Sequence, residues 1–173
     1  SRYTPVYAMG SYDGNICYCI EPGVSLKTGD RFTKKGENFW DSYPSSYNKT
    51  ISPDDIKLFI GRIMHYGYTG TISASWRSQN EGGDKLAHAV ATQLLIWETI
   101  VGERDEDFNK VGTGSKDAIL DQISANHPLR SKIMNYYNSI AADVQTHSKV
   151  PSFFSKSTGK AQNIELEWDG EKY

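Results

Sequence analysis

The feature that most constrains the fold is the stretch "DKLAHAVATQLLIWETIVG", which carries the longest helical pattern of apolar residues in the 173-residue chain. Its periodicity predicts a helix from Lys85 to Val101. Gly102 would end this helix, because glycine readily adopts the left-handed conformation in which helices often stop. At 100° per residue, one arc of the helix is apolar and consists of Leu86, Val90, Trp97, Ile100 and Val101. We therefore expect this face to pack into the core.

Gln93 lies in the middle of that apolar arc. A buried amide without a hydrogen-bond partner costs on the order of 1 to 3 kcal/mol, so this side chain needs either a partner or a chemical use. A core glutamine with satisfied hydrogen bonds is the simpler interpretation, because buried polar groups are usually paired. Position alone leaves both interpretations open.

Three further helices are predicted around this one. The segment "SPDDIKLFIGRIMHYG" has Ser52 as an N-cap and Pro53 at the first helical position, and its apolar spacing continues to about Tyr66. The segments "SKDAILDQISANH" and "PLRSKIMNYYNSIAADVQTHSK" are also read as helices, and Pro128 begins the second.

Strand patterns are found toward both ends of the chain. Short apolar runs at residues 6–9 and 16–20 lie among Gly, Pro, Tyr and Ser residues, and apolar and acidic residues alternate near Trp168. We expect one α+β domain over residues 1–173, in which strands over about 1–50 and 160–173 flank a helical middle over about 53–148.

Composition excludes several classes of partner. The hydrophobic content of 38% supports a single core, and the net charge of -2 contains no block of like charge, so no nucleic-acid surface is expected. No apolar run approaches the roughly 20 residues that cross a bilayer, so no membrane insertion is expected. The chain carries no sorting signal, and we expect it to be one domain of a longer protein.

Two cysteines, Cys17 and Cys19, stand two positions apart. On a strand, their side chains would project to the same face with Cα atoms roughly 6.6 Å apart, and a disulfide over that distance would be strained. A structural disulfide is therefore not expected. By default, both residues would be small buried hydrophobes.

The sequence predicts no metal site and no cofactor. Two thiols do not make a zinc site, and the histidines lack paired-ligand spacing; these are His65, His88, His127 and His147. The acidic run "ERDED" at residues 103–107 lacks the alternating ligand spacing of a calcium loop, which favours a solvated loop at the end of a helix.

Two short motifs carry a family resemblance. The segment "YCI", from Tyr18 to Ile20, and the segment "TQLLIW", from Thr92 to Trp97, resemble the paired signature of thioester domains in Gram-positive bacterial surface proteins. In that family, the motif cysteine and glutamine are joined side chain to side chain by an internal thioester. The resemblance implies a bond between Cys19 and Gln93.

The resemblance also implies a fold and selects one of the two thiols. The family fold places a β-sandwich-like part beside a central helical subdomain. Cys19 is favoured over Cys17 because it alone follows a tyrosine and precedes an isoleucine. Cys17 would then be a buried neighbour or a competitor for disulfide formation.

A thioester gives the two residues a chemical use. The Cys19 thiolate would attack the Gln93 carboxamide and release ammonia, and burial suggested by Tyr18 and Trp97 would shield the product from water. A primary amine would then form an amide with Gln93 and free the thiol. The resemblance implies single-turnover attachment, rather than enzymatic turnover, to a lysine amine on a host cell-surface or extracellular-matrix protein. It implies a monomeric domain of a cell-wall-anchored virulence protein on the bacterial surface.

Two other functions stay open from the sequence. One is a cysteine peptidase or acyl transferase with Cys19 as nucleophile, although such nucleophiles usually begin a helix and the residues after Cys19 indicate a turn. The other is a non-covalent adhesin or carbohydrate-binding module that uses exposed aromatic residues. Tyr68 and Trp76, in the glycine-rich loop before the glutamine helix, would either line an entrance to the thioester or pack in the core.

Overall fold

Helix α4 (Asp84–Val101) forms the centre of the fold. The computed structural model describes residues 10–12, 14–24, 31, 33, 35–36, 39–42, 50–73, 75–80, 83–112 and 118–147. The other described elements are strands β1 (Gly10–Tyr12) and β2 (Asn15–Cys17), helices α1 (Phe39–Ser42), α2 (Pro53–Tyr66), α3 (Trp76–Gln79) and α5 (Arg130–Thr146), and the 3₁₀ helix η2 (Ile119–Gln122).

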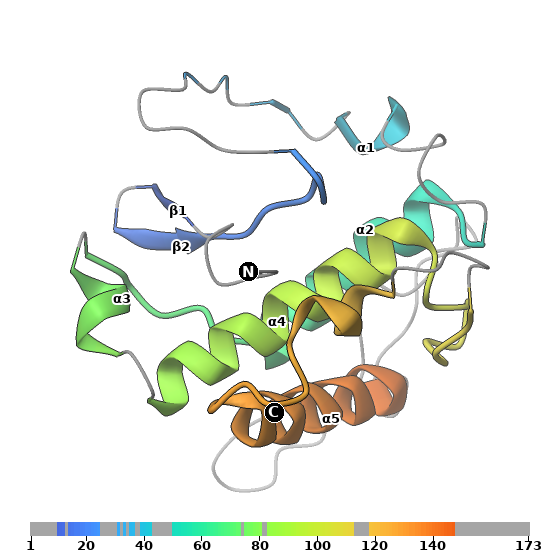
Figure 1. The fold of residues 1–173 in the computed structure, drawn as a ribbon. Helices are drawn as coiled ribbons and strands as arrows, with labels where there is room; N and C mark the ends of the chain where they lie inside the picture. Colours follow the sequence, from blue (N-terminus) through green and yellow to red (C-terminus); the bar gives the residue numbers. More distant parts are fainter. Residues whose placement is uncertain are drawn as a thin grey trace, which may run out of the picture.

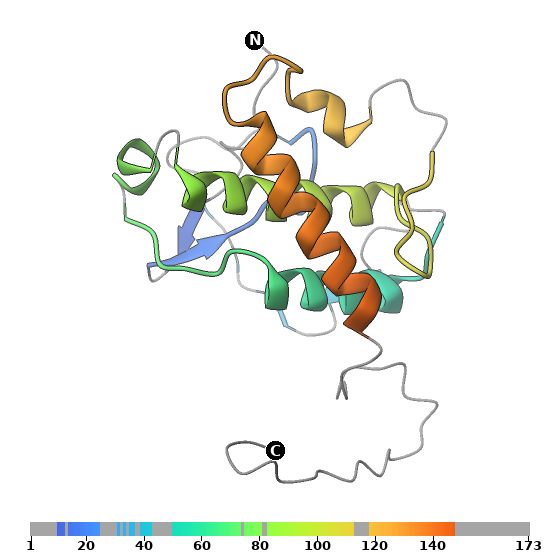
Figure 2. The ribbon, with the colours of Figure 1, turned by 90° about the horizontal axis from the view of Figure 1, so that it is seen from below.

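Helices α2 and α5 both contact α4 and also contact each other. Figure 1 shows the β1–β2 hairpin on one side of α4 and α5 on the other, and Figure 2, turned by 90° to a view from below, shows α5 crossing α4. Every residue from Ala89 to Ile100 is buried, so this part of α4 is enclosed on all sides, beyond the single arc that the sequence pattern indicated. Polar side chains in this segment therefore depend on partners inside the protein.

The predicted start of α2 and the predicted end of α4 are confirmed. Helix α2 begins at Pro53 after Ser52, whose hydroxyl oxygen accepts a hydrogen bond from the Asp55 main-chain N–H at 3.2 Å. Helix α4 ends at Gly102, which adopts φ 83°, and the Gly102 N–H donates to the Glu98 carbonyl. Residues with a Cβ rarely adopt this left-handed conformation, and this explains the glycine.

Strands β1 and β2 form an antiparallel hairpin in which Ser11 pairs with Ile16. The hairpin is joined to the segment after α2, because the Ile72 N–H donates to the Gly14 carbonyl at 2.7 Å and Asn15 forms a bridge with Thr71. The helical middle of the predicted α+β fold is confirmed, together with this one hairpin. The predicted strands at residues 6–9 and 160–173 lie outside the described residues, and the β-sandwich-like part stays a prediction.

The predicted helix over residues 115–127 is wrong for its described part. That part holds only the single 3₁₀ turn η2, followed by a turn in which the His127 N–H donates to the Ser124 carbonyl at 3.0 Å. The cause is a competing partner: the Ile119 N–H donates to the Glu103 carboxylate at 2.9 Å instead of continuing a helical ladder. Helix α5 begins at Arg130, two residues after the predicted start.

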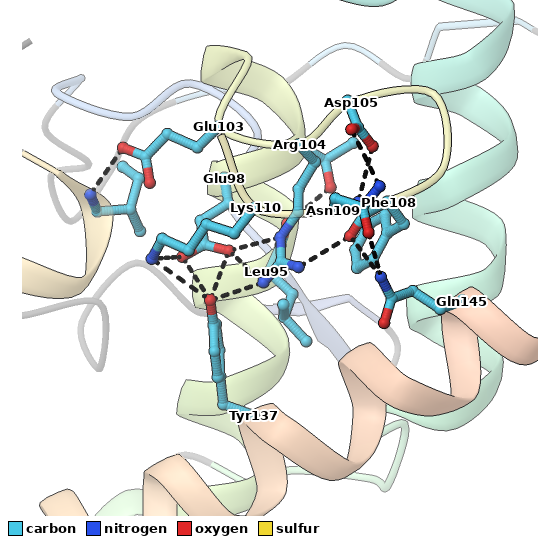
Figure 3. A network of polar contacts seen from close by, with 12 residues as sticks. Leu95, Glu98, Glu103, Arg104, Asp105, Phe108, Asn109, Lys110, Tyr137 and Gln145 are labelled. Atoms are coloured by element: carbon cyan, nitrogen blue, oxygen red, sulfur yellow. Dashed lines mark hydrogen bonds and ion pairs between the residues drawn. The ribbon is translucent and has the colours of Figure 1, made fainter. Parts of the chain in front are cut away.

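A buried ionic network holds the end of α4 (Figure 3). Glu98 has no exposed surface, and its carboxylate accepts from Arg104 at 2.8 Å, from Lys110 at 2.9 Å and from the Tyr137 hydroxyl at 2.8 Å. Two nearby cations and a phenol therefore compensate the buried charge. The network joins α4 to α5 and to the loop between them.

The predicted solvated loop at residues 103–107 is wrong for its first two residues. Glu103 and Arg104 are buried, and Arg104 also donates to the Phe108 carbonyl at 2.9 Å. The guanidinium is drawn inward because Glu98 needs a counter-charge in the core. Asp105 closes the loop by accepting from the main-chain N–H of Asn109 at 2.7 Å.

We expect Glu98→Gln to destabilise the fold by roughly 3 to 5 kcal/mol, because it leaves the Arg104 guanidinium buried without a counter-charge. Lys110→Met is the matched control: the Lys110 side chain is 39% exposed, so its loss should cost about 1 kcal/mol or less. Denaturation by urea measures both changes. Equal stability of Glu98→Gln and the parent would contradict the role assigned to this network.

Candidate functional site

The side-chain amide of Gln93 pairs with the main chain of Cys19. The Cys19 N–H donates to Gln93 Oε1 at 2.8 Å, and Gln93 Nε2 donates to the Cys19 carbonyl at 2.7 Å. Gln93 has no exposed surface, so these two bonds supply the partners that a buried amide requires. They also place the amide group directly beside the residue that bears the thiol.

Cys19 lies just beyond the end of strand β2. It is half-buried, and its Sγ donates to the Glu21 carbonyl at 3.4 Å. The strand predicted over residues 16–20 therefore stops early, because the main chain of Cys19 pairs with a side chain from α4 instead of a neighbouring strand.

Cys17 is exposed, so the expectation that it is buried was wrong. It ends β2, where the buried position belongs to Ile16, and the side chains of a strand alternate between its faces. The two cysteines also do not share a strand face as expected, since Cys19 is outside the strand. Of the two, Cys19 is the one whose main chain contacts the Gln93 amide.

The pairing suits attack of a thiol on the amide carbon of Gln93. Negative charge would develop on Oε1 during such an attack, and the Cys19 N–H already donates to that oxygen at 2.8 Å. The group that would leave is Nε2, which the Cys19 carbonyl holds at 2.7 Å. The sequence did not identify this donor, because a main-chain N–H leaves no mark in the residue pattern.

The residues that precede Cys19 and Gln93 are also brought together. The Tyr18 hydroxyl donates to the Tyr68 carbonyl at 2.5 Å, and the Tyr68 N–H donates to Thr92 Oγ1 at 2.9 Å. The Thr92 hydroxyl in turn donates to the His88 carbonyl at 2.8 Å. Burial raises the pKa of Tyr18 far above its ordinary value, although the Thr92 hydroxyl opposes the shift, so the phenol stays protonated and donates.

A family model described as Thioester domain matches residues 16–146. The chain belongs to the thioester domain family. The match spans both motifs that carried the resemblance, and so confirms it. No curated protein and no solved structure matches the chain significantly. That Cys19 and Gln93 are the cross-linked pair of this thioester domain stays a prediction, which their pairing supports.

Two of the aromatic residues predicted near the site lie in one cluster. The rings of Tyr68 and Trp76 are 5.4 Å apart, and the Tyr68 and His88 rings are 5.8 Å apart. His88 also stacks on Tyr136 at 4.5 Å, and burial lowers the pKa of His88, opposed by a hydrogen bond with the Tyr66 main chain. Trp76 is 8% exposed and packs in the core, whereas Tyr68 is half-buried.

Trp97 is 5% exposed and belongs to the core of the thioester domain. It lies one helical turn after Gln93, as the motif predicted, and positions four apart share a helix face. Its indole N–H has no hydrogen-bond partner among the described residues.

Sequence reasoning missed Gly67. A Cβ atom added at this glycine would lie 2.5 Å from Thr92 Cγ2 and 2.6 Å from Thr92 Oγ1, so the α2 terminus approaches α4 too closely for a larger residue. The only sequence signal is a glycine directly after a helix, and this signal is ambiguous because glycine often follows helices for conformational reasons. Here φ is -82°, which any residue adopts, so the constraint is space.

Neither a metal site nor a membrane span is found among the described residues. Within the described ranges, no group of three or more His, Cys, Asp or Glu side chains is placed to hold a metal ion. None of the described helices combines the length and apolar character that a membrane span requires.

The amide at position 93 should be required by its two bonds to residue 19. We expect Cys19→Ala/Gln93→Glu to be less stable than Cys19→Ala at pH 8, by roughly 1 to 3 kcal/mol or more, because a carboxylate oxygen would face the carbonyl of residue 19. The single variant is the proper reference, since it lacks the thiol but keeps both main-chain groups.

The stability difference should depend on pH. Burial raises the pKa of a carboxyl group, so the folded double variant would bind a proton more tightly than its unfolded chain. Its stability is therefore lost as pH rises through the raised pKa, and the gap between the variants should narrow toward pH 5. Urea denaturation of both variants at pH 8 and at pH 5 measures this difference in stability. Variants of equal stability at pH 8 would show that the Gln93 amide is not held as described.

Proposed function

We propose that this thioester domain is a covalent adhesin, in which a thioester between Cys19 and Gln93 reacts once with an amine on a host surface molecule. The observation that carries the proposal is the pairing of both polar groups of the Gln93 amide with the main chain of Cys19, at 2.8 and 2.7 Å. Membership of the thioester domain family supports it.

The atoms that form the bond come from these two side chains. Cys19 Sγ adds to Gln93 Cδ, a C–S bond forms and the C–N bond breaks. Ammonia leaves with Nε2 and takes up the proton of the thiol. The Cys19 N–H stabilises the charge on Oε1 in the tetrahedral intermediate. Because carboxamides are poor acylating agents, close placement by the fold must lower the activation barrier for attack.

Attachment to the target reverses the role of the thiol. The nitrogen of a primary amine adds to Gln93 Cδ, an amide C–N bond forms and the C–S bond breaks. Cys19 leaves as a thiol, with the proton that the amine loses. The amine that fits is a lysine side chain on a host cell-surface or extracellular-matrix protein. Each molecule reacts once, so the domain is not an enzyme that turns over.

The proposed location follows from the family. Thioester domains are found generally in extracellular surface adhesins, which supports a location outside the cell. We assign the domain to a cell-wall-anchored virulence protein of a Gram-positive bacterium, where it acts as a monomeric unit. The predicted β-sandwich-like part would complete its fold.

One observation favours a second candidate, a non-covalent adhesin or carbohydrate-binding module. Both polar groups of Gln93 are already paired, and this also describes an ordinary buried glutamine. In this alternative Cys19 keeps a free thiol, and binding would use half-buried aromatic side chains such as Tyr68. The two candidates differ in the mass of the protein.

The test is the intact mass of denatured, unreduced protein before and after incubation with methylamine. We expect the parent protein to lack the mass of one ammonia, and then to gain one methylamine and release one thiol. Cys17→Ala should behave in the same way, because Cys17 is exposed and its Sγ donates to the Asn15 carbonyl. Cys19→Ala and Gln93→Ala should have their full encoded masses and no reaction.

A parent protein with its full encoded mass would support the non-covalent candidate instead. Hydrolysis of a thioester that had formed earlier would convert Gln93 to glutamate, and mapping of the peptide that contains residue 93 detects this change. The assignment would be contradicted if Cys19→Ala lost ammonia while Cys17→Ala kept its full encoded mass. It would also be contradicted if the parent protein formed no adduct with methylamine.

A further inference from the structure

We propose that the main chain of Gly67 and Tyr68 is a positioning element for the Cys19–Gln93 reaction. This inference rests on the proposed function, and it concerns residues outside both sequence motifs. The segment leaves the end of α2 and passes between the residues that precede the thiol and the amide in sequence.

The peptide groups of Tyr68 bind in both directions. Its N–H donates to Thr92 Oγ1 at 2.9 Å, and Thr92 is the residue directly before Gln93. Its carbonyl accepts from the Tyr18 hydroxyl at 2.5 Å, and Tyr18 is the residue directly before Cys19. One residue of the chain therefore joins the two motifs by hydrogen bonds, separately from the pairing of Cys19 with Gln93.

Thr92 is anchored from both sides, so it can transmit position. Its hydroxyl accepts from Tyr68 and donates to the His88 carbonyl at 2.8 Å, one turn earlier on α4. Thr92 has no exposed surface, and its side chain is therefore fixed by packing as well as by hydrogen bonds. We call this chain of hydrogen bonds, from the His88 carbonyl through Thr92 and the Tyr68 main chain to Tyr18, the relay. It connects the buried helix α4 to the residue directly before Cys19.

Gly67 allows the relay to form. The approach of α2 to α4 leaves no room for a Cβ at this position, where Thr92 atoms would be 2.5 and 2.6 Å away and the Ile63 carbonyl oxygen 2.6 Å away. A side chain at residue 67 would push Tyr68 away from Thr92. Gly61, within α2, is exposed and has nothing within 4 Å of its Cβ position, so it provides a matched control.

The physical argument concerns the placement of reacting atoms. The hydrogen bonds between Cys19 and Gln93 fix the amide against the main chain, whereas the relay fixes the strand end against the helix. A displacement of about 1 Å between reacting groups can slow a reaction about 10²-fold. Loss of the relay should therefore slow bond formation more than it lowers the stability of the fold.

The experiment follows bond formation in the full chain during cell-free synthesis, by intact mass under denaturing, unreduced conditions. Tyr18→Phe removes one hydroxyl and keeps the ring, and Thr92→Val removes the other hydroxyl and keeps the shape. Each should slow the loss of ammonia by roughly one order of magnitude. Thr92→Ser keeps the hydroxyl and should restore most of the rate. Gly67→Ala should also lose ammonia more slowly than the parent protein, and Gly61→Ala should lose it at the parental rate.

A second measurement separates positioning from general destabilisation. The same substitutions are made in Cys19→Ala, which forms no thioester, and their melting temperatures are compared with that of Cys19→Ala alone. The inference holds if Tyr18→Phe and Thr92→Val slow the reaction while the melting temperature changes little.

Three outcomes overturn the inference. Bond formation at the parental rate in Tyr18→Phe and Thr92→Val would show that the relay is not needed. If bond formation slowed in proportion to the decrease in melting temperature, and Thr92→Ser were as slow as Thr92→Val, the relay would have a structural role only. A parent protein that never loses ammonia would overturn the proposed function itself, and the positioning role with it; the parental mass distinguishes this outcome from the first two.

Discussion

The burial of α4 from Ala89 to Ile100 is the constraint on which the rest of the structure depends. A helical segment enclosed on all sides has no water to satisfy its polar side chains, so they depend on partners inside the protein. Thr99 donates to the Leu95 carbonyl of its own helix at 2.8 Å. Glu98 draws in Arg104 and Lys110, and Gln93 pairs with Cys19. The ionic network and the candidate site both supply hydrogen-bond partners to buried polar side chains of α4.

These two features are coupled through the helix that carries both. Glu98 follows Gln93 by five residues, which corresponds to about 7.5 Å along a helix. The network joins the end of α4 to α5 through Tyr137, while the relay through Thr92 joins its first half to the end of α2. The amide is therefore held in a helix fixed on both sides of it. Such support makes a defined geometry possible at a single buried amide.

The sequence predicted those parts of the fold that depend on local patterns. The bounds of α2 and the end of α4 followed from Ser52, Pro53 and Gly102, because capping and proline effects act over a few residues. The helix predicted before Pro128 failed, since the Ile119 N–H is captured by Glu103, which is distant in sequence. Inward-facing Arg104 was also missed, because a charged residue after a helix is usually solvated.

The residues of the candidate site were likewise predicted only where a local pattern marks them. Gln93 was marked by its position in an apolar arc, and Cys19 by a motif that a family resemblance made meaningful. The exposure of Cys17, the close approach at Gly67 and the N–H donor of Cys19 depend on how separate segments meet in space. Residue types alone carry little information about such contacts, because glycine and main-chain groups have many other uses.

Both hydrogen bonds that the Gln93 amide makes with residue 19 use main-chain groups of that residue. Every residue except proline presents the same N–H and carbonyl, so exchange of the side chain at this position leaves the recognition in place. In the proposed reaction, the architecture thus separates the placement of the electrophile from the identity of the nucleophile. The alignment of the amide therefore does not itself depend on the thiol that it places nearby.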